Sequence, residues 1–272
     1  MDFQRRFGGI ARLYGDEALQ RFVAAHVCLI GIGGVGSWAA EALARSGVGA
    51  ITLVDLDNLA ESNINRQVHA MESQLGRAKV EAMAERIREI NPACRITRVE
   101  DFAEPGNLDL LIHEGFDHVL DCIDSYRVKA ALIAHCRRRK IPVVTAGGAG
   151  GRVDPLKIRM GDLSRTEHDP LLAKTRKLLR QDYGFSRNTK RRFGVPCVYS
   201  WEQARPPVSP EIACSSKVEG MTGLNCAGYG SSVAVTASFG LAAAAYVMSR
   251  LAVTGLTSPA IDETASPPVP VE

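Results

Sequence analysis

The chain of 272 residues lacks the cysteine patterns of structural zinc sites and of disulfide frameworks. Its seven cysteines are odd in number, and no two of them are spaced as Cys-x-x-Cys. Secreted disulfide proteins usually have an even set, and structural zinc sites usually use paired cysteines at that spacing. The sequence therefore favours a protein of the reducing cytoplasm, without a structural zinc ion.

A strong net charge, a secretory leader and a strongly lipophilic run are also missing. The formal net charge is only +3, so the average composition indicates no class of partner. The N-terminus shows no basic segment followed by an apolar run, and we expect no secretion. Ser231–Ser249 is uncharged and long enough to cross a bilayer, but Ala, Ser, Gly, Val and Thr dominate it. We expect a buried core helix there, with membrane association as the alternative.

Strand-like apolar runs alternate with helical periodicity through the first 150 residues. The runs are Val27–Ile32, Ile51–Asp55, Arg95–Glu100, His118–Asp121 and Pro142–Ala146, and the main helical segments are Gly76–Asn91 and Tyr126–Arg139. Such alternation predicts right-handed β-α-β crossovers. The expected fold is α/β and Rossmann-like, with a doubly wound, mainly parallel sheet.

Beyond Gly147–Gly151 the pattern is looser. We expect a strand near Ile158–Met160, a charged helix near Pro170–Gln181, an irregular loop through Cys214 and an apolar helix near Ser231–Arg250. Residues 1–253 are predicted to form a single domain, with a nucleotide-binding core at about 20–155 and a substrate-side extension of mixed strands and helices at about 156–253. Residues 254–272 contain four prolines and no periodicity, which indicates a disordered tail.

Closely spaced glycines, Gly31, Gly33, Gly34 and Gly36, follow the first apolar run. A buried strand that turns sharply into a helix at glycines presents backbone N–H groups and the helix dipole to a phosphate. Asp55 ends the second run, where a carboxylate can accept hydrogen bonds from a ribose. These features predict a nucleotide site. Packing alone would also explain the glycines, a loop cap would explain the aspartate, and a dehydrogenase would show both.

Charged residues downstream favour a nucleoside triphosphate over a dinucleotide. The polar loop Asp57–Gln67 contains Arg66, and Lys79 lies in the first turn of the next helix. Two cations beside a glycine turn suit the charge that builds on a transferring phosphorus. Asp121 ends the fourth run and Asp124 lies three residues further on, where it is placed to hold Mg²⁺ against phosphate oxygens. The alternatives are a loop salt bridge for the arginine, a solvated lysine, and a helix-capping role for either aspartate.

These separated elements resemble, in order and spacing, the nucleotide site of the ThiF/MoeB superfamily of ubiquitin-activating-enzyme-like adenylating proteins. The matching residues are Gly31, Gly33, Gly34, Gly36 and Ser37, Asp55 and Asp57, Ser62, Asn63, Arg66 and Gln67, Lys79, and Asp124. The resemblance covers about residues 5–155 and implies adenylation of a carboxylate by ATP with release of pyrophosphate. Arg66 and Lys79 would then stabilise charge on the phosphates, while Asp55 binds the ribose. Asp124 would hold Mg²⁺.

Within the superfamily, the chain resembles the bacterial tRNA threonylcarbamoyladenosine dehydratases over nearly its whole length. The residues that carry this resemblance are Arg6–Gly15, Gly147–Gly151, Val153–Pro155, Cys197–Ser200 and Cys226–Gly228. That family activates the threonyl carboxylate of a modified adenosine in tRNA, and internal attack then closes a ring and releases AMP. The resemblance implies tRNA as the partner, a homodimer and a cytoplasmic location. It leaves open a bound Na⁺ or K⁺ ion and an associated cysteine desulfurase or sulfur-acceptor system.

The chain departs from the wider superfamily in two respects. It lacks the Cys-x-x-Cys pairs with which sulfur-carrier activators hold zinc, and it reads Arg6-Phe7-Gly8-Gly9 where those proteins often supply an arginine to the partner subunit. Arg6 and Arg12 are the candidates for such a finger. The rival functions are adenylation of a ubiquitin-like sulfur carrier and a nucleotide-binding scaffold in a sulfur relay that performs no chemistry.

Positive charge is concentrated between Lys174 and Arg192, where eight Lys or Arg residues accompany one acid. Such a stretch in a nearly neutral chain is typical of contact with a phosphate backbone. The residues that we assign to nucleic acid are Lys174, Lys177, Arg180, Lys190, Arg191 and Arg192. The basic run Arg137–Lys140 would extend this surface, and a solvated loop is the alternative.

Cys226 precedes the apolar helix near the end of the chain. Some superfamily members use a cysteine in this region for a thioester or a disulfide with their substrate. An intramolecular ring closure needs no covalent enzyme intermediate. A packed cysteine is therefore the favoured interpretation, and a catalytic thiol is the alternative.

Overall fold

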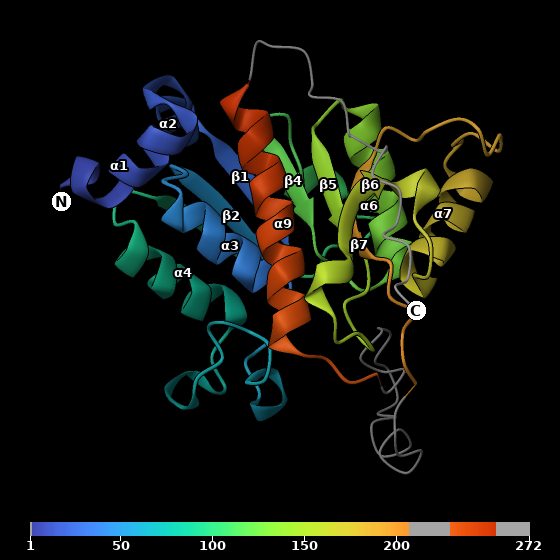
Figure 1. Cartoon of the computed structure of the whole chain (residues 1–272), viewed down its shortest axis with the longest axis horizontal. Helices are drawn as coiled ribbons and strands as arrows, with labels where there is room; N and C mark the ends of the chain where they lie inside the picture. Colours follow the sequence, from blue (N-terminus) through green and yellow to red (C-terminus); the bar gives the residue numbers. More distant parts are fainter. Residues whose placement is uncertain (1, 207–228, 254–272) are drawn as a thin grey trace, which may run out of the picture.

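The computed structural model describes residues 2–206 and 229–253, and seven strands in these ranges form one sheet (Figure 1). The strands are β1 (His26–Ile30), β2 (Ala50–Val54), β3 (Arg95–Val99), β4 (His118–Asp121), β5 (Val143–Ala146), β6 (Ile158–Asp162) and β7 (Pro196–Ser200). Their order across the sheet is β3-β2-β1-β4-β5-β7-β6, and all neighbours are parallel except β6 and β7. The expected doubly wound, mainly parallel α/β fold is therefore confirmed.

Helices cover both faces of this sheet. The α-helices are α1 (Phe3–Tyr14), α2 (Asp16–Ala24), α3 (Gly36–Arg45), α4 (Lys79–Ile90), α5 (Leu108–Leu111), α6 (Tyr126–Arg138), α7 (Pro170–Asp182) and α9 (Val233–Ala252). Short 3-10 turns lie at Glu61–Asn63, Glu72–Gln74, Pro155–Lys157 and Leu163–Arg165. α3 and α9 lie side by side on one face, and α6 and α7 pack together at the other (Figure 1).

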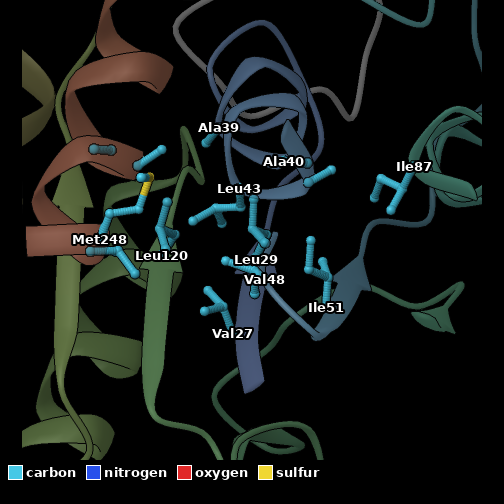
Figure 2. Close-up of a cluster of buried hydrophobic side chains, with 14 of the residues drawn as sticks. Val27, Leu29, Ala39, Ala40, Leu43, Val48, Ile51, Ile87, Leu120 and Met248 are labelled. Atoms are coloured by element: carbon cyan, nitrogen blue, oxygen red, sulfur yellow. The ribbon is translucent and has the colours of Figure 1, made fainter. Parts of the chain in front are cut away.

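The hydrophobic core includes two clusters, one on each face of the sheet, and β1 is buried between them. Val27 and Leu29 point into a cluster shared with α2, α3, α4 and α9, whereas Cys28 and Ile30 point into a cluster beneath α5 and α6. Successive side chains of a strand point to opposite faces, so an apolar run with no polar alternation is what this position requires. Figure 2 shows part of the first cluster, including Val27, Leu29, Ala39, Ala40, Leu43, Val48, Ile51, Ile87, Leu120 and Met248.

The uncharged helix α9 is part of this core. Among the helices in the described ranges, it alone has the length and hydropathy of a membrane span. Val235, Phe239 and Ala243 nevertheless pack in the main hydrophobic cluster, as the predicted buried helix would. A Cβ at Gly240 would overlap the carbonyl oxygen of Val35, so the missing side chain lets α9 lie directly on the start of α3.

The prediction of an irregular loop through Cys214 was wrong for Pro196–Ser200, which form β7. This strand pairs with β5 in parallel and with β6 in antiparallel orientation. Cys197 and Val198 are both fully buried, on opposite faces, so the strand shows none of the polar–apolar alternation used to recognise strands. β6 and β7 join the sheet formed by the predicted nucleotide-binding core. Cys214 and the tail 254–272 lie outside the described residues.

A buried imidazole in β4 makes the folded state sensitive to acid. His118 is 2% exposed, its ring stands edge-on to Tyr246 of α9, and its Nδ1 lies 3.1 Å from the carbonyl oxygen of Val119. Burial lowers the pKa of His118 from 6.5 to about 4. Between these two values the unfolded chain binds a proton that the folded chain does not, so the free energy of unfolding must fall as the pH falls.

We predict that His118 alone costs the protein about 3 kcal/mol of stability on acidification from pH 7 to pH 4, since a tenfold difference in proton affinity is worth about 1.4 kcal/mol. A His118→Gln variant should lose about 2 kcal/mol less than the wild type between pH 7 and pH 4.5. Urea denaturation at a series of pH values measures this difference. Parallel stability curves for the two proteins would contradict the prediction.

Candidate active site

The turn between β1 and α3 leaves its backbone open at the carboxyl edge of the sheet. Gly31 has φ +87°, and its N–H donates to the carbonyl oxygen of Val54 (2.9 Å). A Cβ at Gly36, the first residue of α3, would overlap the carbonyl oxygen of Gly31. A Cβ at Gly33 would meet only the Gln67 amide, at 4.0 Å. Residues 31 and 36 therefore need glycine for the shape of the turn, and Gly33 leaves an open surface for a ligand.

Asp55, Asp57 and Lys79 form a charged cluster next to this turn. Asp55 follows β2, and its carboxylate accepts hydrogen bonds from the N–H groups of Ile32 (2.6 Å) and Asp57 (2.9 Å). Lys79, at the start of α4, donates to Asp57 Oδ2 (2.6 Å) and lies 3.7 Å from Asp55 Oδ1. Burial raises the pKa of Asp55, and the nearby ammonium of Lys79 opposes that rise. Asp55 therefore fixes the glycine turn and retains lone pairs for a ribose hydroxyl.

Arg66 lies across the glycine turn. A Cβ at Gly34 would approach the Arg66 Cγ to 3.1 Å, so a side chain at residue 34 would displace the arginine. Trp38 of α3 donates from Nε1 to the carbonyl oxygen of Arg66 (3.0 Å). The guanidinium donates to the carbonyl oxygen of Ser62 (2.5 Å) and to Asn65 Oδ1 (2.9 Å). The structure thus brings the predicted arginine and the predicted glycines together.

Two buried polar atoms next to the turn have no hydrogen-bond partner within the described residues. They are Oε1 of Gln67, which is 5% exposed, and Oγ1 of Thr236, which is 3% exposed. The Thr236 methyl would lie 3.3 Å from a Cβ at Gly34, so α9 also borders the turn. Buried polar groups are nearly always satisfied, which suits a polar ligand here. Asn63, in contrast, has a local bond, since its Oδ1 accepts from the N–H of Ala60 (3.1 Å).

Asp124 lies in the connection between β4 and α6, and its side chain reaches solvent. The surrounding protein still removes enough water to raise the pKa of Asp124, while Lys129 and Lys79 oppose the rise and Asp57 adds to it. Burial lowers the pKa of Arg66, and the charge of Asp124 opposes that change. The charges of Arg66, Lys79, Asp57 and Asp124 therefore lie at the same edge of the sheet, close enough to affect one another.

The carboxylates at this edge fit a magnesium ion that arrives with a triphosphate. The described residues contain no group of three or more His, Cys, Asp and Glu side chains able to cage a metal. Mg²⁺ commonly takes one or two carboxylates and completes its shell with water and phosphate oxygens. The helix-cap alternative is not observed, because the cap of α6 is Ser125 and no side chain bonds to the free N–H groups there.

The predicted basic residues fall at two different places. Lys174 and Lys177 are exposed on α7, and Lys174 Nζ lies 5.6 Å from the ring centroid of Tyr126, the first residue of α6. Lys190, Arg191 and Arg192 lie in the exposed loop before β7. That loop lies at the opposite, amino edge of the sheet. There the Asp162 carboxylate, at the end of β6, accepts hydrogen bonds from the loop's backbone N–H groups at residues 193–195.

Arg180 joins these two places along α7. It donates from Nε to the carbonyl oxygen of Ser186 (3.3 Å), and its guanidinium carbon lies 5.0 Å from the ring centroid of Phe193. Arg137, at the end of α6, donates to the carbonyl oxygen of Gly194 (3.5 Å). The second basic run therefore reaches the same loop, as its sequence indicated.

Arg6 and Arg12, the two candidate finger residues, have different surroundings on α1. Arg6 donates from one nitrogen to the carbonyl oxygens of Glu89 (3.1 Å) and Ile90 (2.6 Å) at the end of α4. Arg6 also lines a cavity of about 800 Å³ between α1, α3 and α4. The glycine turn contributes no residue to the lining of this cavity. Arg12 is exposed and makes no hydrogen bond or ion pair with another described residue. Arg12 is therefore the freer of the two.

The described cysteines are not poised as nucleophiles. Burial raises the pKa of Cys94 to about 11 and those of Cys122 and Cys136 to about 12, and it also raises the pKa values of Cys28 and Cys197. A thiol reacts as its thiolate, so these side chains are structural. The candidate Cys226 lies outside the described residues, and its role stays a prediction.

Two features of this edge escaped the sequence analysis. Thr236 lies in a run whose uncharged composition gives no sign of a site. Trp201, 37% exposed, follows β7 at the carboxyl edge, with the guanidinium of Arg159 4.9 Å from its ring centroid and the ring of His168 at 5.3 Å. Exposed aromatic and guanidinium planes are the surfaces on which unpaired bases stack, but no motif marks this tryptophan.

Comparisons with known proteins agree with this geometry. The ThiF family model matches residues 7–260. The chain is 52% identical over 252 residues to the tRNA threonylcarbamoyladenosine dehydratase of Escherichia coli K12, covering 92% of this chain and 94% of that protein. The corresponding Haemophilus influenzae protein is 47% identical, with the same coverage. A crystal structure of the E. coli dehydratase in complex with ATP superimposes with a TM-score of 0.83 at 50% identity, covering 92% of this chain and 96% of that chain.

The glycine turn generates a prediction that separates folding from ligand binding. Gly33→Ala should change the free energy of unfolding by less than about 1 kcal/mol, because its Cβ meets no backbone. The added methyl should nevertheless weaken binding of ATP, the nucleotide expected from the sequence, at least about tenfold, since it occupies the surface where phosphates approach. Gly36→Ala is the contrasting variant and should cost about 3 kcal/mol or more, because its Cβ overlaps Gly31.

Urea denaturation and calorimetric titration with ATP measure the two effects. Wild-type ATP affinity in Gly33→Ala would show that the nucleotide does not approach this part of the turn.

Proposed function

This chain belongs to the ThiF family, and we propose that it is an ATP-dependent enzyme that dehydrates threonylcarbamoyladenosine in tRNA through adenylation of its carboxylate. The observation that carries this proposal is that the glycine turn, Arg66, Lys79 and Asp124 lie together at one edge of the sheet. The sequence supports it, since the chain is 52% identical over 92% of its length to a tRNA threonylcarbamoyladenosine dehydratase. The related E. coli enzyme has been crystallised with ATP and with AMP, the substrate and the product that such a reaction requires.

The reaction consists of two displacements, the first at the α-phosphorus of ATP and the second at the activated carbonyl carbon. An oxygen of the threonyl carboxylate attacks the α-phosphorus of ATP, and pyrophosphate leaves. A nucleophilic atom of the carbamoyl group then attacks the activated carbonyl carbon and closes the ring, the carbamoyl nitrogen releases a proton, and AMP leaves with the carboxylate oxygen. The modified adenosine thereby loses the elements of one water molecule. The oxygen leaves in AMP, and ATP is converted into AMP and pyrophosphate.

The residues of the site divide this work. The backbone of the glycine turn holds the phosphates, and Asp55 orients the ribose. Arg66 and Lys79 stabilise charge as it develops on the phosphates, which is where preorganised cations lower a barrier most. Lys79 is held by Asp57 at 2.6 Å and is therefore already in place when the nucleotide enters. Asp57, Asn63 and Gln67 complete the polar wall, and the buried amide oxygen of Gln67 has no hydrogen-bond partner within the described residues.

Asp124, with Asp57 nearby, is the group that would hold Mg²⁺ against the phosphates. When bound, the ion supplies charge neutralisation at the phosphate oxygens. A bound Na⁺ or K⁺ ion and an associated cysteine desulfurase or sulfur acceptor remain part of the proposal through the family resemblance alone. A cytoplasmic location accords with a tRNA substrate and with the burial of α9 in the core.

The proposed enzyme works as a homodimer in which Arg12 reaches the partner's nucleotide. Arg12 is favoured over Arg6 because Arg6 is occupied by the carbonyl oxygens at the end of α4, whereas Arg12 is exposed and unpaired within the described residues. A guanidinium delivered in this way would add to transition-state charge stabilisation.

Incubation of tRNA bearing threonylcarbamoyladenosine with ATP, Mg²⁺ and the protein tests the function. We expect mass spectrometry of the tRNA nucleosides to show loss of one water, with tRNA-dependent release of pyrophosphate. Asp124→Asn should reduce this release by about a hundredfold or more, because the metal loses its anchor. Release that requires a small protein carrier and ignores tRNA would favour the sulfur-carrier alternative. No release with either would favour the scaffold.

Transfer RNA is proposed to bind along α7, from Lys174 and Lys177 near the nucleotide to Lys190, Arg191 and Arg192 at the opposite edge. A helix of 13 residues is about 20 Å long, and a nucleic acid presents several phosphates over that distance. Replacing Lys190, Arg191 and Arg192 with Ala should weaken tRNA binding at least about tenfold and lower its salt dependence, with ATP binding unchanged.

A charge-matched control removes Arg88, Arg95 and Arg98 near β3, at the far side of the sheet. This control should bind tRNA like the wild type. Fluorescence anisotropy with labelled tRNA at several salt concentrations measures both proteins. Equal tRNA affinity and equal salt slopes in the two triple variants would contradict the assignment of this surface.

A further inference from the structure

A charged network is completely buried beneath the connection that contains Asp124. Asp121, Lys129 and Thr145 are each 0% exposed. Lys129 donates to Asp121 Oδ2 (2.7 Å) and to Thr145 Oγ1 (3.0 Å), and the Thr145 hydroxyl donates to Asp121 Oδ2 (2.6 Å). The three side chains come from β4, α6 and β5, so the network joins three elements at the carboxyl edge of the sheet.

The second oxygen of Asp121 determines where the chain goes next. Asp121 Oδ1 accepts a hydrogen bond from the N–H of Ile123 (3.1 Å), which bends the backbone directly after β4. Cys122 then rests on the glycine turn, since a Cβ at Gly31 would lie 3.0 Å from the Cys122 carbonyl oxygen. The same network therefore sets the connection against the phosphate-binding turn.

Asp124 has no comparable support of its own. Its side chain makes no hydrogen bond or ion pair with another described residue, so its place depends on the backbone of residues 122–125. That backbone is held on one side by Asp121 and on the other by α6, where Lys129 lies. The position of the Asp124 carboxylate is thus inherited from the buried pair.

Stability alone does not account for a buried ion pair. Removing two charges from water offsets most of their attraction, and apolar side chains of similar volume often replace such pairs without loss. Apolar residues could hold β4 to α6, but they would leave the Ile123 N–H without its acceptor. Within the described residues, only the bond from the Cys122 N–H to the Ile30 carbonyl oxygen (2.9 Å) would then fix the start of the connection. The specific contribution of the network is therefore geometric.

We propose that Asp121, held by Lys129 and Thr145, is a positioning residue that fixes the 122–125 backbone and so aims Asp124 at Mg²⁺ and the phosphates. This inference rests on the proposed function, in which Asp124 holds the metal. Groups behind a metal ligand commonly change metal affinity by about 10- to 100-fold when they are altered.

The test measures how much Mg²⁺ strengthens ATP binding, by calorimetric titration with ATP in the presence of Mg²⁺ or of EDTA. Asp121→Leu combined with Lys129→Met removes both charges, fills the space and leaves no acceptor for Ile123. We expect this variant to bind metal-free ATP within about twofold of the wild type and to lose at least about tenfold of the gain from Mg²⁺. Asp121→Asn combined with Lys129→Met retains an amide oxygen for Ile123 and should recover most of that gain.

A matched control replaces Glu41 with Leu and Arg86 with Met, an ion pair of 2.6 Å between α3 and α4 whose glutamate is 5% exposed. This control should change the melting temperature but not the gain from Mg²⁺. An equal gain in the Asp121→Leu/Lys129→Met variant and in the control would overturn the inference. Asp124→Asn separates failure of this inference from failure of the proposed metal site. Loss of the gain in Asp124→Asn, with the gain retained in Asp121→Leu/Lys129→Met, overturns the inference alone. An unchanged gain in Asp124→Asn would show that Asp124 does not hold the metal, and the inference would fail with that assignment.

Discussion

The backbone contact between Gly31 and Gly36 is the constraint on which the site depends. A side chain at residue 36 would overlap the carbonyl oxygen of Gly31, so β1 can turn into α3 within six residues only because both positions are glycine. Three features follow from this turn. The Asp55 carboxylate accepts a hydrogen bond from the Ile32 N–H of the turn. The Arg66 side chain lies across Gly34, and the connection after β4 packs against Gly31. The nucleotide site is therefore formed around a backbone shape.

Charged groups around the turn are arranged in pairs rather than left alone. Lys79 lies between Asp55 and Asp57, and Lys129 neutralises Asp121 beneath the surface. Each of these two buried ammonium groups therefore has a carboxylate partner within the protein. A triphosphate entering such a site meets cations already in position, which reduces the reorganisation that its transfer chemistry would otherwise require.

The fold was largely readable from the sequence because its strands are continuous apolar runs between helices, as β1, β2 and β4 show. Residues that follow a strand or begin a helix, such as Asp55, Lys79 and Asp124, could be placed by topology alone. β7 could not, because its apolar run is only Cys197–Tyr199, bounded by Pro196 and Ser200, and a long irregular loop separates it from the preceding predicted helix. Thr236 and Trp201 could not either, since their positions at this edge depend on which elements pack together. The basic residues between Lys174 and Arg192 also fall into two groups at opposite edges of the sheet, because α7 runs from one edge to the other. The sequence alone did not indicate this separation.

The oxygen that leaves with AMP tests the central claim, carboxylate adenylation at this site, most directly. The tRNA substrate would carry ¹⁸O in the threonyl carboxylate and react with unlabelled ATP, and the products would be analysed by mass spectrometry. Attack of the carboxylate on the α-phosphorus predicts one ¹⁸O atom in AMP and none in pyrophosphate. Label appearing in a phosphate released from the γ-position, or in water, would contradict the account.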